Sequence, residues 1–239
     1  MLEIKYVDKR YPASNALLYV KELTIAQGEV VGILGENGSG KTTLLKAIMG
    51  IGEIQNGEIR IDGRPVTEQY DRIAFVTEEG SYFPHLTPRQ YGQFLSDFFP
   101  RFDSERYAAL IQDYEIPEDR KIKTFSRGQK MKLELCAGLA KRADYLILDE
   151  PFVGKDVFTR RESLNRVVAG LTGEETVLLT THQIDEIENV IDRAIVLHRG
   201  LVRADVYVDE VRERGLSLTD VMAEVRKTNY ARPFGWPDE

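Results

Sequence analysis

The chain contains a glycine-rich segment, residues 35–42, that reads Gly-Glu-Asn-Gly-Ser-Gly-Lys-Thr. This segment fits G-x-x-x-x-G-K-[ST], the pattern of a phosphate-binding loop. The apolar run at residues 29–34 predicts a buried strand before the loop, and residues 43–49 predict the start of a helix after it. The flanking strand and helix favour this interpretation over a glycine-rich turn with a chance lysine.

The loop carries the groups that bind a nucleoside triphosphate. Its glycines let consecutive backbone N–H groups turn towards a phosphate, and the helix N-terminus adds partial positive charge. Lys41 is expected to reach the terminal phosphates and to take part in catalysis, and the Thr42 hydroxyl is expected to bind Mg²⁺. The predicted nucleotide-binding residues of the loop are Asn37, Gly38, Ser39, Gly40, Lys41, Thr42 and Thr43.

Composition and charge narrow the class of protein. The 239 residues, 42% of them hydrophobic and 30% charged, are typical of a globular protein of one or two domains. No apolar run approaches the roughly 18 residues that span a bilayer, and the N-terminus does not resemble a signal sequence, so we expect a cytosolic protein. A net charge of −7 argues against nucleic acid as the main partner. The single cysteine, Cys136, is expected to be a small buried side chain.

Hydrophobic patterns predict a mixed α/β sheet. Alternating apolar residues at 2–6 and 22–25 predict half-buried antiparallel strands at the start of the chain. The apolar runs at 73–76, 145–148 and 176–179 predict buried strands of a parallel sheet. Alternation of strands and helices around a phosphate loop favours a doubly wound sheet with ligands at the carboxyl ends of its strands.

A small helical insertion is predicted between two of these strands. Thr87 and Gln90 have the spacing of a capping box around a proline at the first helical position. Apolar side chains then follow at helical spacing, at Tyr91, Phe94, Leu95 and Phe98. The aromatic residues are expected to form the core of the insertion, and some of them, around Tyr91 and Phe94, an exposed docking face.

Three polar residues follow the predicted buried strands. Asp149 and Glu150 end the run 145–148, and burying carboxylates is costly unless they meet a cation. Asp149 is therefore expected to bind Mg²⁺, and Glu150 to orient or deprotonate an attacking water; two solvated acids at a strand end are the alternative. His182 closes another strand, where its ring N–H would bind the γ-phosphate and the water.

A second anion-binding helix end is predicted at Ser126. This residue has the position of an N-cap for a helix that runs through Met131, Leu135 and Leu139. The segment Ser-x-Gly-Gln is short and, alone, also fits an ordinary capped helix. Its place shortly before Asp149, with a phosphate loop far upstream, makes the pattern specific.

With these motifs in place, the chain resembles the nucleotide-binding subunit of ABC transporters up to about Gly200. Residues 125–129 are similar to the signature motif, 149–150 to the end of Walker B, and 154–156 to the D-loop. His182 is similar to the switch histidine and Tyr11 to the aromatic residue that stacks on adenine. The resemblance implies that Tyr11, Ser126, Gly128 and Gln129 contact the nucleotide and that Glu150 and His182 are catalytic.

The resemblance also implies the fold. We expect an α/β P-loop NTPase core with a mainly parallel sheet, an N-terminal antiparallel β-subdomain and an inserted α-helical subdomain. The expected segments are 1–85 for the core with the phosphate loop, 86–125 for the helical subdomain, 126–200 for the rest of the core, and 201–239 for a C-terminal extension.

A further implication is an ATP-bound, head-to-tail dimer with Mg²⁺. Each nucleotide would lie between the phosphate loop of one subunit and the Ser126 helix end of the other, in a homodimer or a heterodimer. The expected partners are integral-membrane transporter subunits that dock on the helical insertion, at the inner face of the cell membrane, with no nucleic acid.

Four departures from the family pattern are visible. Glu78 stands where glutamine is usual, and its carboxylate is still expected to approach Mg²⁺. Arg127 replaces a glycine of the signature, and Lys155 stands where leucine is usual. Residues 152–153, Phe-Val, replace a pair that commonly carries hydroxyl groups. Glu78 and Arg127 are similar to residues in ATPases of bacterial drug, bacteriocin and antibiotic exporters, which favours export.

Two other classes of function are weighed against transport. A soluble ABC-type ATPase acting on nucleic acid or ribosomes would need long coiled coils or two nucleotide-binding domains, and this chain shows neither pattern. An unrelated kinase or GTPase is the other class. The sequence has no Asn-Lys-x-Asp motif for guanine, and a small-molecule kinase gives no reason for the helix end at Ser126.

Overall fold

The structure is a computed structural model that describes residues 1–11, 16–77, 80–151, 164–165 and 167–227, without the side chains of residues 11, 16 and 186. Contacts divide the chain into two compact units. The first unit is Met1–Tyr70 with Thr176–Glu239, and the second is Asp71–Glu175. The finer segment boundaries expected from the sequence, after residues 85, 125 and 200, remain predictions.

The first unit is built on a mixed sheet. Its strands follow the order β5-β4-β1-β2-β10-β9-β3-β8. The strands are β1 (Leu2–Tyr11), β2 (Ala16–Ile25), β3 (Val30–Leu34), β4 (Asn56–Ile61), β5 (Arg64–Pro65), β8 (Thr176–Thr181), β9 (Arg193–His198) and β10 (Leu201–Tyr207).

Strand β3 leads into the phosphate loop and is parallel to a neighbour on each side. Its last residue, Leu34, lies opposite Thr181 of β8 and Val196 of β9. Strands β1, β2 and β4 pair antiparallel, and the Asp62-Gly63 turn joins β4 to β5 with φ values of 48° and 77°. The predicted antiparallel opening and parallel core are therefore confirmed.

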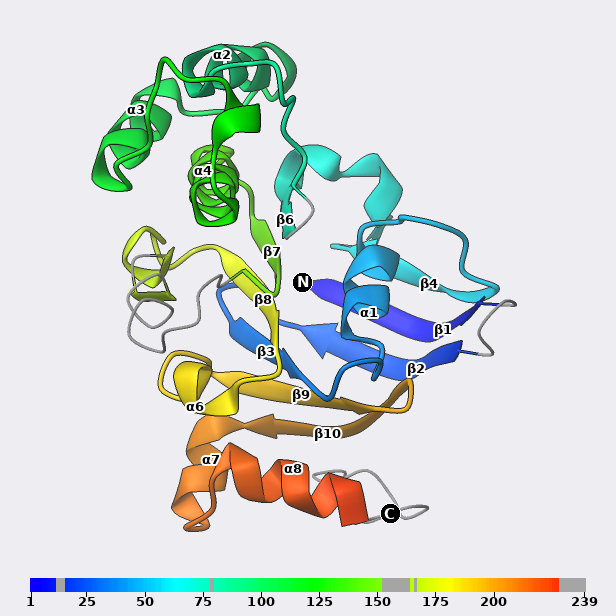
Figure 1. The fold of residues 1–239 in the computed structure, drawn as a ribbon. Helices are drawn as coiled ribbons and strands as arrows, with labels where there is room; N and C mark the ends of the chain where they lie inside the picture. Colours follow the sequence, from blue (N-terminus) through cyan, green and yellow to red (C-terminus); the bar gives the residue numbers. More distant parts are fainter. Residues whose placement is uncertain (12–15, 78–79, 152–163, 166, 228–239) are drawn as a thin grey trace. The chain divides into compact units, whose positions relative to one another are not determined.

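The helices of the first unit pack around this sheet. They are α1 (Lys41–Ile48), α6 (Ile184–Ile187), α7 (Val208–Glu213) and α8 (Leu218–Lys227), with a 3₁₀ turn at Val66–Glu68; a second 3₁₀ turn, Tyr70–Arg72, includes the boundary between the units. Helix α8 runs along β10 and β9 (Figure 1) and buries the apolar stripe Leu218, Val221, Met222 and Val225. No helix within the described ranges has the length and apolar character to cross a membrane.

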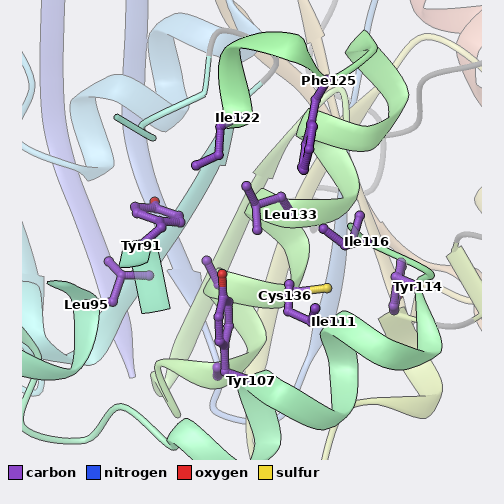
Figure 2. Packing of buried hydrophobic residues seen from close by; sticks show 12 residues of the cluster. Tyr91, Leu95, Tyr107, Ile111, Tyr114, Ile116, Ile122, Phe125, Leu133 and Cys136 are labelled. Atoms are coloured by element: carbon purple, nitrogen blue, oxygen red, sulfur yellow. The ribbon is translucent and has the colours of Figure 1, made fainter. Parts of the chain in front are cut away.

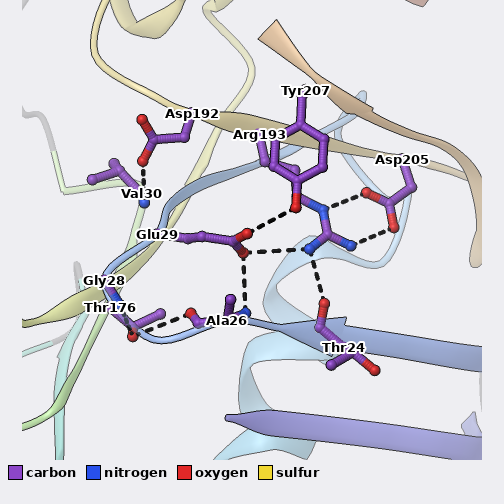
Figure 3. A network of polar contacts seen from close by, with 10 residues as sticks. All are labelled: Thr24, Ala26, Gly28, Glu29, Val30, Thr176, Asp192, Arg193, Asp205 and Tyr207. Carbon is purple, nitrogen blue, oxygen red and sulfur yellow. Dashed lines mark hydrogen bonds and ion pairs between the residues drawn. The ribbon is translucent and has the colours of Figure 1, made fainter. Parts of the chain in front are cut away.

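A polar network fixes the beginning of the strand that carries the loop (Figure 3). Arg193 donates to both carboxylate oxygens of Asp205, at 2.6 and 2.7 Å, and to the Thr24 carbonyl at 2.8 Å. Glu29, directly before β3, pairs with Arg193 at 3.3 Å and accepts from the Tyr207 hydroxyl at 2.9 Å. The hydrogen bonds to Asp205 raise the pKa of Arg193, whose side chain is only 12% exposed. The network therefore ties the N-terminal end of β3 to β2, β9 and β10.

The second unit joins two parallel strands to a group of helices. The strands are β6 (Ile73–Thr77) and β7 (Tyr145–Asp149), and the helices are α2 (Pro88–Phe98), α3 (Ser104–Asp113) and α4 (Arg127–Ala140), with a 3₁₀ turn at Ile122–Thr124. The capping box predicted for Thr87 and Gln90 begins α2, which confirms that helix start.

Aromatic and aliphatic side chains from α2, α3 and α4 form one core in the second unit (Figure 2). Cys136 lies in this core, and burial raises the pKa of its thiol to about 12, so the predicted buried role is confirmed. Tyr91 is also in the core and is 2% exposed, so the expectation that it belongs to an exposed face is wrong. A helical stripe of aromatic residues does not reveal which members the neighbouring helices cover.

Tyr91 has a polar partner inside this core. Glu134 of α4 is 3% exposed, and its carboxylate accepts from the Tyr91 hydroxyl at 3.1 Å and from the Ser81 hydroxyl and backbone N–H at 2.7 and 3.1 Å. Burial, and next the negative charge of Glu134, raise the pKa of Tyr91, so its hydroxyl stays protonated as a donor. Glu134 therefore joins α4 to α2 and to the segment after β6.

We predict that Glu134→Ala lowers the free energy of unfolding by about 2–4 kcal/mol, because it leaves three donors without their acceptor and removes packed volume. Tyr91→Phe should cost only about 1 kcal/mol, since it removes one donor and keeps the ring. Urea denaturation measures both values. A Glu134→Ala protein within about 0.5 kcal/mol of wild type would show that the buried carboxylate contributes no net stability.

Candidate functional site

The phosphate loop adopts a backbone that requires glycine at several positions. The φ angles of Gly35, Gly38 and Gly40 are 153°, 79° and 109°. A Cβ at Gly35 would also collide with the Leu197 carbonyl, whereas at Gly38 it would meet no described atom within 4 Å. The loop is thus tightly packed where it leaves β3 and open at Gly38.

Lys41 lies folded over the start of its own loop. Its side chain is 6% exposed, and Nζ donates to the carbonyl oxygens of Gly35 at 2.9 Å and Glu36 at 3.3 Å. Helix α1 begins at Lys41 after the N-cap residue Gly40, which has no side chain to cap the helix. The positive end of α1 and the Lys41 ammonium therefore lie at the same loop.

The residues of this loop fit a bound phosphate. Ser39 is 5% exposed, and its Oγ has no hydrogen-bond partner among the described residues. A phosphate oxygen is an acceptor that would supply such a bond, and Lys41 would supply the opposite charge. Asn37 and Thr42 are exposed and Thr43 is half-buried, so the loop also presents polar side chains at its surface.

His182 leaves the sheet beside the phosphate loop. It follows Thr181, and Thr181 lies opposite Leu34, the residue that directly precedes Gly35. The carboxyl ends of two neighbouring parallel strands thus carry the loop and the histidine. His182 is exposed, and its Nε2 lies 3.3 Å from the Gln183 side-chain nitrogen. The structure therefore brings together these two predicted parts of the site within the first unit.

The predicted acids lie together at the equivalent strand ends of the second unit. Asp149 is the last residue of β7, is 8% exposed, and lies opposite Thr77 at the end of β6. Glu150 follows with φ 47°, a left-handed conformation that is uncommon for glutamate and that turns the chain away from the strand.

Ser126 caps helix α4 as predicted. Its Oγ accepts from the Gln129 N–H at 3.2 Å, and the Gln129 side chain accepts from the Ser126 N–H at 3.0 Å. Ser126 and Arg127 are exposed, and a Cβ at Gly128 would approach no described atom closer than 4.0 Å, the distance to Ser126 Oγ. This helix end is therefore an open surface of the second unit.

Several predicted residues lie outside the described part of the chain. They are Glu78, residues 152–153, residues 154–156 with Lys155, and the side chain of Tyr11. Tyr11 itself ends strand β1, and Glu78 directly follows Thr77, the residue opposite Asp149. Their predicted roles remain predictions.

Two contacts of the loop have no counterpart in the sequence analysis. The Gly200 N–H donates to the Ser39 carbonyl at 2.9 Å, so the turn between β9 and β10 supports the loop. Glu36 forms an ion pair with Arg226 of helix α8 at 3.0 Å. Both partners are far from the loop in the chain, and neither belongs to a local motif. No pattern in the sequence around Gly200 or Arg226 signals either contact.

The first unit also has a cavity of about 550 Å³ between the end of α1 and strands β4 and β5. Its walls include Ala47, Gly50, Ile54, Ile59 and Val66. None of the predicted site residues lines it. The cavity is therefore separate from the candidate site.

Comparison with known proteins agrees with this geometry. A protein-family model described as ABC transporter matches residues 20–153. The chain is 31% identical over 238 residues to the ABC transporter ATP-binding protein YtrB of Bacillus subtilis, covering 96% of this chain and 81% of that protein. It is 26% identical to the SkfA peptide export ATP-binding protein SkfE of the same organism, covering 100% and 99%.

Among solved structures, the fold is similar to that of an ATP-binding subunit of an ABC transporter. The TM-score is 0.79 at 26% sequence identity, and the match covers 95% of this chain and 99% of that one. The predicted fold class, a P-loop NTPase core with an antiparallel β-subdomain and a helical insertion, is confirmed by this likeness together with the strand pairing described above.

We predict that Lys41→Ala weakens ATP binding by at least about tenfold, because it removes a charge-assisted contact to phosphate. Titration with ATP, followed by calorimetry, measures the affinity. Lys46→Ala is the matched control, since Lys46 lies on the last turn of the same helix and its loss removes the same charge. Equal affinities for the two variants, both still folded by circular dichroism, would refute the assignment of the loop.

Proposed function

This chain belongs to the ABC transporter family and is an ATPase of that family, and we propose that it drives export through separate membrane subunits by dimerising around ATP. The proposal rests on one observation. The phosphate loop follows β3, His182 follows β8, and these two parallel strands are neighbours in the sheet. That arrangement supports a nucleotide held by its phosphates at the carboxyl edge of the sheet.

Catalysis is assigned to the side chains at the strand ends. Lys41 and the N-terminus of α1 bind the phosphates and offset their negative charge. The Glu150 carboxylate orients the attacking water and accepts its proton, and the exposed His182 ring donates to the γ-phosphate. Thr42 and Asp149 offer a hydroxyl and a carboxylate, oxygen ligands that Mg²⁺ prefers, and Glu78 is assigned to the same ion. When bound, Mg²⁺ would neutralise charge that develops on the phosphates.

The helix end at Ser126 is assigned to the nucleotide of a second subunit. The Ser126 oxygen accepts its capping bond from Gln129, which leaves the hydroxyl hydrogen to donate to a phosphate oxygen. The open surface at Gly128 allows close approach of another molecule. In a head-to-tail dimer, ATP would connect two subunits and hydrolysis would remove that connection. Tyr11 is assigned to stack on the adenine, with Asn37 and Thr43 completing the contacts.

The docking face for membrane subunits is assigned to aromatic side chains near α2. Phe83 and Phe98 are 48% and 67% exposed, and both pack on the half-buried Phe94, with ring centroids 4.8 and 4.5 Å apart. A contiguous exposed aromatic patch is typical of a protein interface. The departures at Glu78 and Arg127 and the likeness to SkfE support export, and a chain docked on membrane subunits would lie at the inner face of the cell membrane.

We predict that Glu150→Gln leaves ATP binding intact, lowers kcat by about 10²- to 10⁴-fold and makes the ATP-bound dimer persist. Phosphate release and size-exclusion chromatography with light scattering measure turnover and dimer. Glu115→Gln is the matched control, because Glu115 is a glutamate of the same unit that also has a left-handed backbone, with φ 54°. Normal turnover by the Glu150 variant would move the base elsewhere, with His182 next to test.

A second prediction concerns the docking face. Phe98→Ser should lower the fraction of the chain recovered with cell membranes by roughly tenfold or more, because truncating a hot-spot residue of an interface costs about 2 kcal/mol or more. Its ATP affinity should be unchanged. Tyr6→Ser, which alters another exposed aromatic residue on β1, is the control. Equal membrane recovery for the two variants would exclude the face at Phe98, and recovery with ribosomes instead would favour the soluble ATPase.

A further inference from the structure

Helix α8 contacts the phosphate loop through one residue near its C-terminal end. Arg226 Nε lies 3.0 Å from Glu36 Oε1, and the two side chains are 56% and 53% exposed. Glu36 is part of the loop itself: its carbonyl accepts from Lys41 Nζ at 3.3 Å and from the Ser39 N–H at 3.1 Å. An ion pair that restrains Glu36 therefore also restrains the carbonyl that Lys41 and Ser39 contact, and both of these residues are assigned to the phosphates.

The other end of α8 contacts the segment that follows His182. The Leu218 N–H donates to Glu188 Oε1 at 2.9 Å. Arg212, on the preceding helix α7, donates to the Glu188 carbonyl at 2.8 Å and to Asn189 Oδ1 at 3.1 Å. The segment between His182 and β9 is thus held by three hydrogen bonds from the C-terminal helices.

Between these ends α8 is anchored on the sheet. Its four buried apolar residues pack against β9 and β10, and β9 pairs directly with β3, the strand that leads into the loop. Burial of these four apolar side chains stabilises the helix on the sheet, because most helical stability in proteins comes from packing of an apolar face. Helix α8 therefore contacts both the phosphate loop and the segment after His182 while it packs on the sheet.

We propose that α8 is a positioning element of the nucleotide site, which holds the phosphate loop through Arg226 and the His182 segment through Glu188. This inference rests on the proposed function of the loop. Arg226 acts through Glu36 in two ways. It offsets a carboxylate that would otherwise repel the phosphates, and it restrains the loop in its binding conformation. Arg226 is a positioning residue and has no assigned contact with the nucleotide.

The test is the affinity for ATP of Arg226→Gln, measured by titration at low ionic strength. We expect a 2- to 5-fold loss, which is about what an exposed ion pair supports. Lys227→Gln removes the same charge from the next position of the helix and should leave the affinity unchanged. Arg226→Lys should recover most of the loss, because an ammonium can still pair with Glu36. High salt should reduce the difference between wild type and Arg226→Gln.

A double-mutant cycle separates positioning from a general effect on folding. In a Glu36→Gln background, Arg226→Gln should cause no further loss of ATP affinity, because its partner is already neutral. A loss of the same size in both backgrounds, or equal losses for Arg226→Gln and Lys227→Gln, would overturn the proposal. Thermal unfolding of each variant should shift by no more than the control, since the pair is exposed.

The ATP affinities of Lys41→Ala and Arg226→Gln together show whether the proposed function or only the role of α8 is wrong. If Lys41→Ala binds ATP normally, the loop is not the nucleotide site, and the positioning role proposed for α8 is refuted as well. If Lys41→Ala abolishes binding while Arg226→Gln equals its control, the loop assignment stands and only the positioning role of α8 is refuted.

Discussion

The pairing of β3 with β8 on one side and with β9 on the other is the interaction on which the first unit depends. A phosphate loop binds through its backbone, so the strand before it has to be held at a fixed register. Parallel neighbours supply that register at Leu34, and the Arg193 network holds the opposite end of the strand. The loop is then supported from outside by Gly200 and by Arg226.

In the second unit, a buried carboxylate holds the helices together. Glu134 lies inside an apolar core, where an unpaired charge would be costly, and its three donors come from Ser81 and Tyr91. Helix α2, which carries the exposed Phe98, and helix α4, which begins at Ser126, thereby share one hydrogen-bonded junction. A partner that displaced α2 would have to break that buried junction or move α4 with it.

The residues predicted for the site are distributed over both units. The first holds the phosphate loop and His182, and the second holds Asp149, Glu150 and the helix end at Ser126. Each set occupies the carboxyl ends of parallel strands or the start of a helix, where backbone geometry exposes polar groups. Under the proposed function, the roles assigned to Lys41 and to Glu150 therefore belong to different units.

Local patterns in the sequence were enough to predict the strands around the loop, the capping box at Thr87, the N-cap at Ser126, and the acids at the end of β7. Strand periodicity, caps and glycine turns depend on residues that are close in the chain, so the interactions that favour them can be recognised in short segments of the sequence. Tertiary structure alone decided that Tyr91 is buried while Phe98 is exposed, although both belong to one helical stripe. It also decided the partners of Glu134 and Arg226, because a side chain far away in the chain becomes a neighbour only when strands and helices have packed.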